Sequence, residues 1–581
     1  MNNFKLLSAI LLTGLLLSSC GTTQKAAQET AAAQTEKKEE IKPLPQKIKS
    51  LFTEDELKNW QHTNPFDSKM PGMSTEKTYD ELLKDKPAKT VIVAVVDAGI
   101  DINHPDLKDI IWTNEDEIPY NGIDDDNNGY VDDVHGWNYL GAKDGRMAGP
   151  EQLELTRLVA KYRPIWKDKS IEEITPENRE TFKLYQRAEK VLAEKLDHIN
   201  QLKPRIDQLY TMVEKAEKTL KDALQTDKLT KEAVEKLESD DPMVIQAKQL
   251  YLGGMDFERV KSYKKYLEDQ EKYNLNVDFN GRIQGDDPDN INDRDYGNPN
   301  VIPPKDDELH GTHVAGIIAQ VRHNGIGGDG VADHVLIMPV RAVPDGDEYD
   351  KDVALAFRYA VDNGAKVINT SFGKYFSPHA DWVWDAIKYA ADHDVLIVNA
   401  AGNDGKDMDQ YGEKISYPND GIEKGMEIAD NFLNVGAIGP YYGPGMVAPF
   451  SNYGKETVDI FSPGQKIYAT VPFGKYKFLQ GTSMASPNVA GVAAVIRSRY
   501  PELSASEVKH IIMDAGLAPQ IRVIRPEEDD YDGPPHLVPF ESLSKSGKIV
   551  NLYNAILLAD ELSKQKKAKA EENQQPVEEN K

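Results

Sequence analysis

Cysteine and positive charge are both scarce in this chain of 581 residues. Cys20 is the only cysteine, so no disulfide can form within the chain. Lys and Arg number 69 against 96 Asp and Glu, which gives a formal net charge of −27. Because nucleic acid is bound by basic surfaces, this balance excludes nucleic acid as the expected partner. The length and a hydrophobic fraction of 39% still predict a large buried core.

Long apolar runs are also rare, and the apolar run near the start of the chain is only twelve residues long. It covers residues 6–17, follows Lys5 and ends in Leu-Ser-Ser-Cys. A run of this length is too short to span a bilayer and is typical of an export signal, here residues 1–20. The ending resembles the bacterial lipoprotein box, which implies a lipid on Cys20 and a place in the bacterial cell envelope. Gly21 favours the outer membrane, while an ordinary cleaved signal remains the alternative.

Composition divides the rest of the chain into segments. Two ends, 21–47 and 563–581, are polar without an apolar period, and we expect a disordered tether and a disordered tail. Residues 48–140 and 295–562 alternate strand-length and helix-length patterns. The segment 141–294 between them is charged and mainly helical, so it reads as an insertion.

Continuous apolar runs predict strands that are buried on both faces. Such strands occur in parallel sheets, so we expect an α/β fold in which helices flank a parallel sheet. The strands are expected at 91–97, 366–370 and 395–400, and helices at 352–363, 381–393 and 483–500.

The insertion carries a heptad-like seam that is typical of a helical hairpin with coiled-coil character. Pro204 is expected to kink or end a helix within it. A solvated decoration and a regulatory or partner-binding element are both compatible with this pattern, and we expect the insertion near the substrate cleft. The seam consists of Leu192, Ile199, Ile206, Val213 and Leu220.

Three short motifs carry residues suited to acyl transfer. Asp97 ends an apolar strand in Val-Val-Asp-Ala-Gly, and His310 opens His-Gly-Thr-His. Ser483 opens a helix in Gly-Thr-Ser-Met-Ala-Ser-Pro, where free N–H groups favour a developing anion. A serine needs an imidazole to take its proton, and the imidazole needs a carboxylate to hold its tautomer. Asn403, after a strand end, can supply a donor to the anion.

Together these motifs resemble those of the subtilisin-like serine peptidases, including the chain order Asp, His, Ser. The resemblance covers residues 90–140 and 300–515. It implies a subtilisin-like sheet, with Ser483 as nucleophile, His310 as general base and Asp97 as its orienting group. It also implies that Asn403 and the Ser483 N–H form an oxyanion hole, and that no catalytic cofactor is needed.

The same resemblance implies a site for protein or peptide substrates. An extended peptide would pair with the strand edge formed by Ser371, Phe372 and Gly373. The small residues Ala400, Ala401 and Gly402 would border the pocket beside the scissile bond. Main-chain pairing of this kind predicts a broad specificity, and Phe372 adds an apolar preference.

Acidic and amide residues at alternate positions predict a structural Ca²⁺ loop. Similar loops occur in calcium-dependent members of the same peptidases, whereas a solvated acidic turn is the simpler alternative. The expected ligands are Asp124, Asp126, Asn128 and the carbonyl of Tyr130, with Asp132 or Asp133 completing the set.

The function expected from the sequence is that of a lipid-anchored serine endopeptidase. Two alternatives differ in class. One is an inactive scaffold that uses the helical insertion and the lipid anchor at Cys20 to bind a protein partner. The other is an esterase, which the strand edge for peptide pairing and the order of the motifs disfavour.

Overall fold

A computed structural model describes residues 52–573, apart from 254, 256, 305–307, 411–414, 424–425, 529–530 and 532. Cys20, the expected signal and the expected tether lie outside these residues. Within them, no helix combines the length and the hydropathy that a membrane crossing needs.

A sheet of seven parallel strands forms the centre of the fold, in the order β2-β3-β1-β4-β5-β8-β9. The predicted α/β class is therefore confirmed. The strands are β1 (Val91–Asp97), β2 (Trp137–Asn138), β3 (Val335–Arg341), β4 (Val367–Thr370), β5 (Leu396–Ala400), β8 (Phe432–Ile438) and β9 (Ile460–Pro463).

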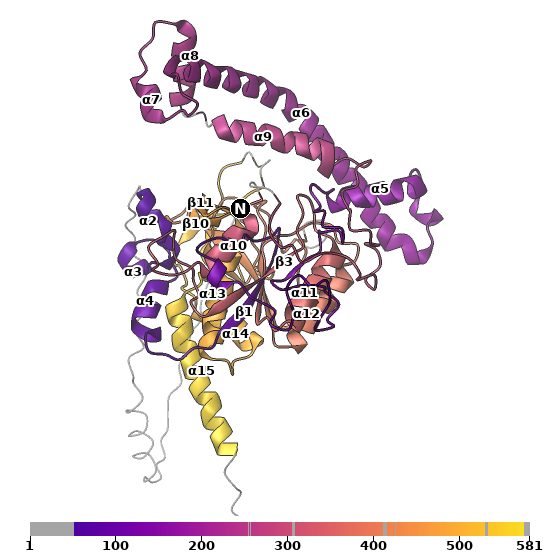
Figure 1. Cartoon of the computed structure of the whole chain (residues 1–581), viewed down its shortest axis with the longest axis vertical. Helices are drawn as coiled ribbons and strands as arrows, with labels where there is room; N and C mark the ends of the chain where they lie inside the picture. Colours follow the sequence, from indigo (N-terminus) through magenta and orange to yellow (C-terminus); the bar gives the residue numbers. More distant parts are fainter. Residues whose placement is uncertain are drawn as a thin grey trace, which may run out of the picture. The chain divides into compact units, whose positions relative to one another are not determined.

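Strand β1 is apolar throughout because both faces of the sheet are covered. Val93 and Val95 belong to one hydrophobic cluster, and Ala94 and Val96 to the other. The first cluster includes residues of α10 (His310–Ala319) and α13 (Thr482–Arg499). The second includes residues of α11 (Asp350–Asp362) and α12 (Ala380–Asp392), so each face of the sheet is covered by different helices (Figure 1).

Smaller elements complete the domain around this sheet. Trp60 and Met73 anchor the N-terminal arm in the first hydrophobic cluster. The remaining strands form three hairpins: β6 (Gly421–Glu423) with β7 (Met426–Glu427), β10 (Ile467–Val471) with β11 (Lys475–Leu479), and β12 (Arg522–Ile524) with β13 (Leu537–Pro539). The short helices of the arm are α2 (Glu54–Lys58), η1 (Trp60–His62), α3 (Pro65–Ser68), α4 (Thr75–Thr78) and η2 (Tyr79–Leu83).

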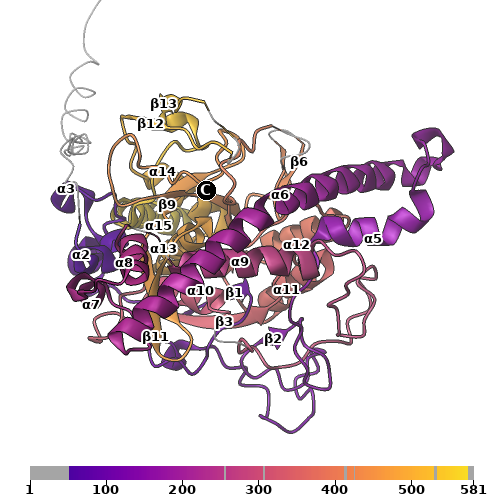
Figure 2. The same ribbon diagram turned by 90° about the horizontal axis from the view of Figure 1, so that it is seen from above.

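The insertion is helical, and its two ends meet. The backbone N–H of Asn138 donates to the carbonyl of Asn298 at 2.9 Å, and that of Asn298 to Asn138 at 3.1 Å. Within the insertion, α6 contacts both α8 and α9 (Figures 1 and 2). Its helices are α5 (Glu154–Trp166), α6 (Arg179–Leu224), α7 (Lys231–Lys236), α8 (Pro242–Leu252) and α9 (Phe257–Asp269).

The long helix α6 departs from one expectation. It continues through Pro204, which was expected to kink or end it. Packing explains the continuity, because apolar residues on both sides of the proline are buried against neighbouring helices. Of the heptad seam, Leu192, Ile199, Val213 and Leu220 are buried, and Ile206 is partly buried.

The expected disorder from residue 563 is wrong for the first part of that segment. Helix α15 (Leu552–Asn573) continues through it. The Ser563 hydroxyl is buried and donates to Glu502, and Lys566 Nζ lies 2.7 Å from Glu507 Oε2. These contacts with the region around α14 (Ala505–Ala515) hold the first part of the segment in a helix. Its composition alone did not predict that order.

Candidate active site

Parallel strands bring three of the predicted site residues to one edge of the sheet. Asp97 is the last residue of β1, Ser371 directly follows β4, and Asn403 lies three positions after β5. In open parallel sheets the carboxyl ends of the strands are where ligands bind. The structure therefore gathers these side chains at the edge where a reaction site is expected.

Asp97 and His310 are hydrogen-bonded. The His310 Nδ1 lies 2.8 Å from Asp97 Oδ1 and 3.0 Å from Oδ2. Asp97 is 1% exposed, whereas the imidazole retains 38% of its surface. Gly311 permits this approach, because a Cβ there would lie 2.3 Å from the Gly99 carbonyl oxygen.

The pKa of His310 lies above its ordinary value. Desolvation acts to lower it, but the charge of the Asp97 carboxylate and the hydrogen bond to it outweigh that effect. The carboxylate therefore fixes the orientation of the ring and stabilises its protonated form.

Ser483 is the second residue of α13. The N-cap of this helix is Gly481, which has a φ of 153°. The Ser483 hydroxyl donates to the carbonyl of Ser371 at 3.1 Å, and the Ser371 hydroxyl donates to the carbonyl of Ser483 at 3.0 Å. In the part of the chain that the structure describes, the Ser371 carbonyl, not His310, is the hydrogen-bond partner of the Ser483 hydroxyl. Attack would therefore require a rotation of the hydroxyl towards the imidazole.

The amide of Asn403 is oriented by Thr482, a residue that the sequence did not single out. Asn403 Oδ1 accepts from the Thr482 backbone N–H at 2.8 Å and from its hydroxyl at 3.0 Å. With the oxygen held, the exposed Asn403 amide nitrogen is left on the side of the neighbouring pocket.

A pocket of about 350 Å³ lies beside Ser483. Ala401 does not line it; it is 1% exposed and belongs to the hydrophobic core. Asp404, Tyr375 and Glu348 also line it and were not predicted; only Asp404, which follows Asn403, was detectable by adjacency. The predicted residues that do line it are Phe372, Gly373, Ala400, Gly402, Asn403 and Ser483.

Sequence comparison decides the family. The subtilase family profile matches residues 88–522, well over half of the chain. The chain belongs to the subtilase family.

Known relatives match part of this subtilase. The thermophilic serine proteinase of Bacillus sp. (strain AK1) is 39% identical over 201 residues, 34% of this chain and 45% of that protein. The cell wall-associated protease of Bacillus subtilis (strain 168) is 35% identical over 208 residues, 36% of this chain and 21% of that protein. The chain thus spans less than half the length of both. A solved protease structure from Pseudoalteromonas arctica PAMC 21717 has a TM-score of 0.34 at 28% identity, over 43% of this chain and 70% of that one.

The insertion of this subtilase supports the wall of the pocket. Glu154, the first residue of α5, lies 2.7 Å from Lys374 Nζ, and Lys374 directly follows the predicted substrate segment. Arg157 donates to the carbonyls of Asp347 and Glu348 at 2.9 and 3.0 Å. The base of the insertion therefore fixes two segments that border the pocket, in agreement with the expectation that it lies near the cleft.

Three carboxylates come together in the acidic loop of this subtilase. Glu117, Asp124 and Asp126 each offer an oxygen within 4.8 Å of the others. Glu117 is 5% exposed, and its Oε2 has no hydrogen-bond partner within the described part of the chain. The pKa of Glu117 is raised because the effect of burial exceeds that of the backbone N–H groups of Asp125 and Asp126, which act to lower it. An unpaired buried oxygen beside two carboxylates is the donor set that Ca²⁺ prefers.

The side chains of Asn128 and Asp133, two other predicted ligands, are engaged elsewhere. The Asn128 side-chain amide donates to Asp126 at 3.0 Å and to Asp133 at 3.2 Å. The Tyr130 ring packs against Trp137, and Asp133, fully buried, also accepts from the Tyr359 hydroxyl at 2.6 Å. Asp133 thus connects the loop to the core. Glu117 lies seven positions before the expected ligand motif, so the spacing of that motif could not predict it as a ligand.

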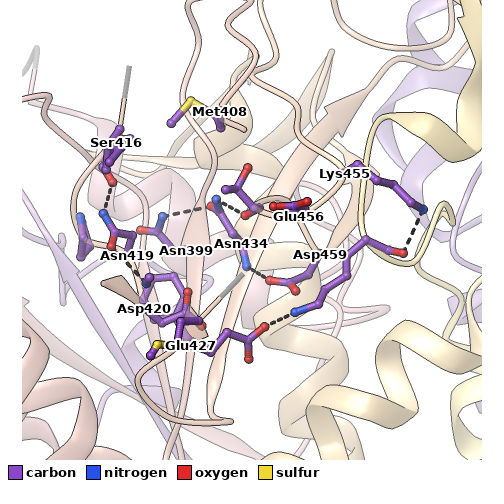
Figure 3. A pocket seen from close by; sticks show the side chains of 17 residues that line it. Asn399, Met408, Ser416, Asn419, Asp420, Glu427, Asn434, Lys455, Glu456 and Asp459 are labelled. Atoms are coloured by element: carbon purple, nitrogen blue, oxygen red, sulfur yellow. Dashed lines mark hydrogen bonds and ion pairs between the residues drawn. The ribbon is translucent and has the colours of Figure 1, made fainter. Parts of the chain in front are cut away.

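A second cavity of about 300 Å³ lies beyond Ser416, which lines both pockets (Figure 3). Its carboxylates are largely paired: Glu427 lies 2.6 Å from Lys509 Nζ, and Asp459 accepts from the Asn434 N–H at 2.7 Å. Burial and the nearby Asp459 raise the pKa of Asp420 to about 7. Neither His310 nor Ser483 lines this cavity, whereas Ser483 and Asn403 line the first pocket.

Proposed function

We propose that this subtilase is a serine endopeptidase. The observation that carries the proposal is the imidazole of His310, held by Asp97 at the strand edge where Ser483 and Asn403 border one pocket. Membership of the subtilase family supports it.

In this mechanism the Ser483 hydroxyl attacks the carbonyl carbon of the scissile peptide bond. Its proton passes to Nε2 of His310, whose Nδ1–H stays hydrogen-bonded to Asp97. The negative charge that develops on the carbonyl oxygen is stabilised by the Ser483 backbone N–H and the Asn403 amide. His310 then protonates the leaving amine, and a water molecule, deprotonated by His310, releases the acyl group from Ser483.

Protein and peptide chains are the proposed substrates. The segment after β4, which includes Phe372 and Gly373, borders the pocket and offers backbone groups for an extended chain to pair with. Such pairing is tolerant of sequence and suits unfolded segments. It also disfavours a small-molecule esterase, which would have no use for a strand edge.

Labelling of Ser483 by a fluorophosphonate tests the proposal. The purified full chain would be treated with the probe, and the modified peptide would be identified by mass spectrometry. We expect the probe on Ser483 and cleavage of unfolded casein at a higher rate than hydrolysis of short acyl esters. A folded protein that neither reacts nor cleaves would instead support the scaffold alternative.

Asn403→Asp is expected to lower kcat by at least about 10²–10³-fold with little change in KM. That magnitude was measured in subtilisin, a relative of this chain. The aspartate keeps an oxygen for the Thr482 N–H but loses the donor, and its charge repels the oxyanion. Steady-state kinetics on a quenched peptide would measure the effect. A rise in KM at constant kcat would remove Asn403 from the oxyanion hole.

We propose that Glu117, Asp124 and Asp126 hold a structural Ca²⁺. Bound to the folded state alone, calcium would stabilise it by about 2.7 kcal/mol at 100 times its Kd. Adding a chelator should therefore lower the melting temperature of the wild-type protein.

The Glu117→Gln variant should melt lower than wild type in calcium and respond little to the chelator. Glu115→Gln is the matched control, because Glu115 is exposed and lies outside the three-carboxylate cluster. A melting temperature that ignores the chelator in the wild type would show that the loop is held by its hydrogen bonds alone.

We propose further that a lipid on Cys20 anchors the protein in a bacterial envelope, with the outer membrane favoured. The apolar run before Cys20 and the residue Gly21 support this. The helical insertion could then bind a protein partner at the membrane. The mass of the N-terminal peptide, purified from membranes, would reveal an acylated cysteine.

A further inference from the structure

The pocket beside Ser483 has an uneven charge. Two acidic residues, Glu348 and Asp404, line it, and none of its described lining residues is Lys, Arg or His. Asp404 is exposed and accepts a hydrogen bond from the Tyr375 hydroxyl. Lys406 Nζ lies 3.7 Å from the centroid of the Tyr375 ring, and Lys406 does not line the pocket.

Glu348 is the unusual member of this pair because it is buried and incompletely paired. The residue is 2% exposed, and its Oε1 lacks a hydrogen-bond partner among the residues that the structure describes. A buried carboxyl group without a partner costs free energy, and ionisation increases that cost. Burial raises the pKa of Glu348 to about 8; Lys374 lowers it, and Asp347 and Asp350 raise it.

The neighbouring cations do not fill this gap. Lys374 Nζ lies 2.7 Å from Glu154 and 2.8 Å from Asp350, and it reaches only the backbone carbonyl of Glu348, at 2.8 Å. Arg157 is shared in the same way: it pairs with Glu154 at 2.6 Å and donates to the Glu348 carbonyl at 3.0 Å. The two cations are therefore hydrogen-bonded to other carboxylates and to backbone oxygens. Lys374 acts on the Glu348 carboxyl group through its charge, while Glu348 Oε1 has no hydrogen-bond partner among the described residues.

We propose that this pocket receives a lysine or arginine side chain of the substrate, with Glu348 as its counter-ion. The inference rests on the proposed peptidase function and names the substrate class of the same site. Ala400 and Gly402, which the family resemblance places beside the scissile bond, line the same pocket, so we assign the basic residue to the position before that bond. Its charge would pair the buried carboxyl group, whereas an apolar side chain would leave that group unpaired. This proposed preference for positive charge differs from the apolar preference expected from Phe372, which also lines the pocket.

Two quenched peptides that differ only in lysine or glutamine before the scissile bond test the inference. For the full chain we expect kcat/KM to be about tenfold or more higher for the lysine peptide. In Glu348→Gln the ratio should fall to within about threefold. Glu180→Gln is the matched control and should keep the wild-type ratio, because Glu180 is an exposed residue of the insertion whose ion-pair partner is Lys183.

The wild-type protein alone can test the preference for a basic residue, even if the Glu348 variant fails to fold. Mass spectrometry of a digested peptide library should show lysine and arginine enriched on the amino-terminal side of its cleavage sites. Fluorophosphonate labelling of Ser483 with cleavage that ignores charge would overturn the inference and leave the peptidase function intact. Absence of both labelling and cleavage would overturn the peptidase function and the inference with it.

Discussion

Replacing Ser483 with alanine is expected to abolish both fluorophosphonate labelling and peptide cleavage. The variant removes the oxygen that forms the acyl-enzyme, while the smaller alanine side chain still fits the first turn of α13. Loss of the nucleophile lowers kcat by about 10⁶-fold in subtilisin, a relative of this chain, and we expect a loss of similar order. Steady-state hydrolysis of a quenched peptide at high enzyme concentration would measure it.

Ser506→Ala is the matched control for this experiment. Ser506 lies on α14, and its hydroxyl bonds to Asp430 rather than to any group of the site. The control should retain wild-type turnover and melting temperature. Cleavage by the Ser483 variant at an undiminished rate would mean that another group is the nucleophile.

Asp97→Asn is expected to lower kcat by about 10⁴-fold at neutral pH. Both oxygens of Asp97 lie within hydrogen-bond distance of His310 Nδ1, so the carboxylate selects the tautomer whose Nε2 can take a proton. An asparagine can instead donate to Nδ1 and favour the other tautomer. Substrate binding should change little, because Asp97 does not line the pocket.

The same variant should change the pH dependence of kcat/KM. The reaction needs a neutral His310, so activity rises as the pH increases through its pKa. In the wild type the Asp97 carboxylate keeps the pKa of His310 above its ordinary value, so the acid limb should lie at a higher pH than for a free imidazole. Without the carboxylate, desolvation remains, and the limb should move to lower pH.

Profiles between about pH 5 and 9 would test this shift, with Asp109→Asn as the matched control. Asp109 is exposed and lies in the short 3-10 helix η3 (Lys108–Ile110). An acid limb that stays in place in Asp97→Asn would show that Asp97 does not set the protonation of His310.

Local patterns in the sequence predicted the sheet and the residues at its edge. Continuous apolar runs located β1, β4 and β5, and the helices α11, α12 and α13 begin and end close to the expected residues. Asp97 and His310 could be paired in advance because their motifs resemble those of the subtilisin-like peptidases. The contact between them spans 213 positions, which no local pattern encodes.

The parts that were not predicted depend on contacts between distant segments. Glu348 and Tyr375 enter the pocket only because the fold brings their loops beside Ser483. Glu117 joins the acidic loop from outside its repeating pattern, whereas Asn128 and Asp133 bond to neighbouring side chains. The end of α15 is ordered by contacts with Glu502 and Glu507, which its own composition does not reveal.

The meeting of the insertion's two ends has a consequence for the order of folding. β1 must pair with β3 in the middle of the sheet, and the Arg341 side chain binds the Ala98 carbonyl across 243 positions. Closing such a long loop carries an entropic cost that slows folding. Asn138 and Asn298 are 160 positions apart and hydrogen-bonded, so an insertion that forms its helices first would bring the two halves of the domain together. The helical insertion would then hold the two halves of the domain close to each other and shorten the time that β1 and β3 need to pair.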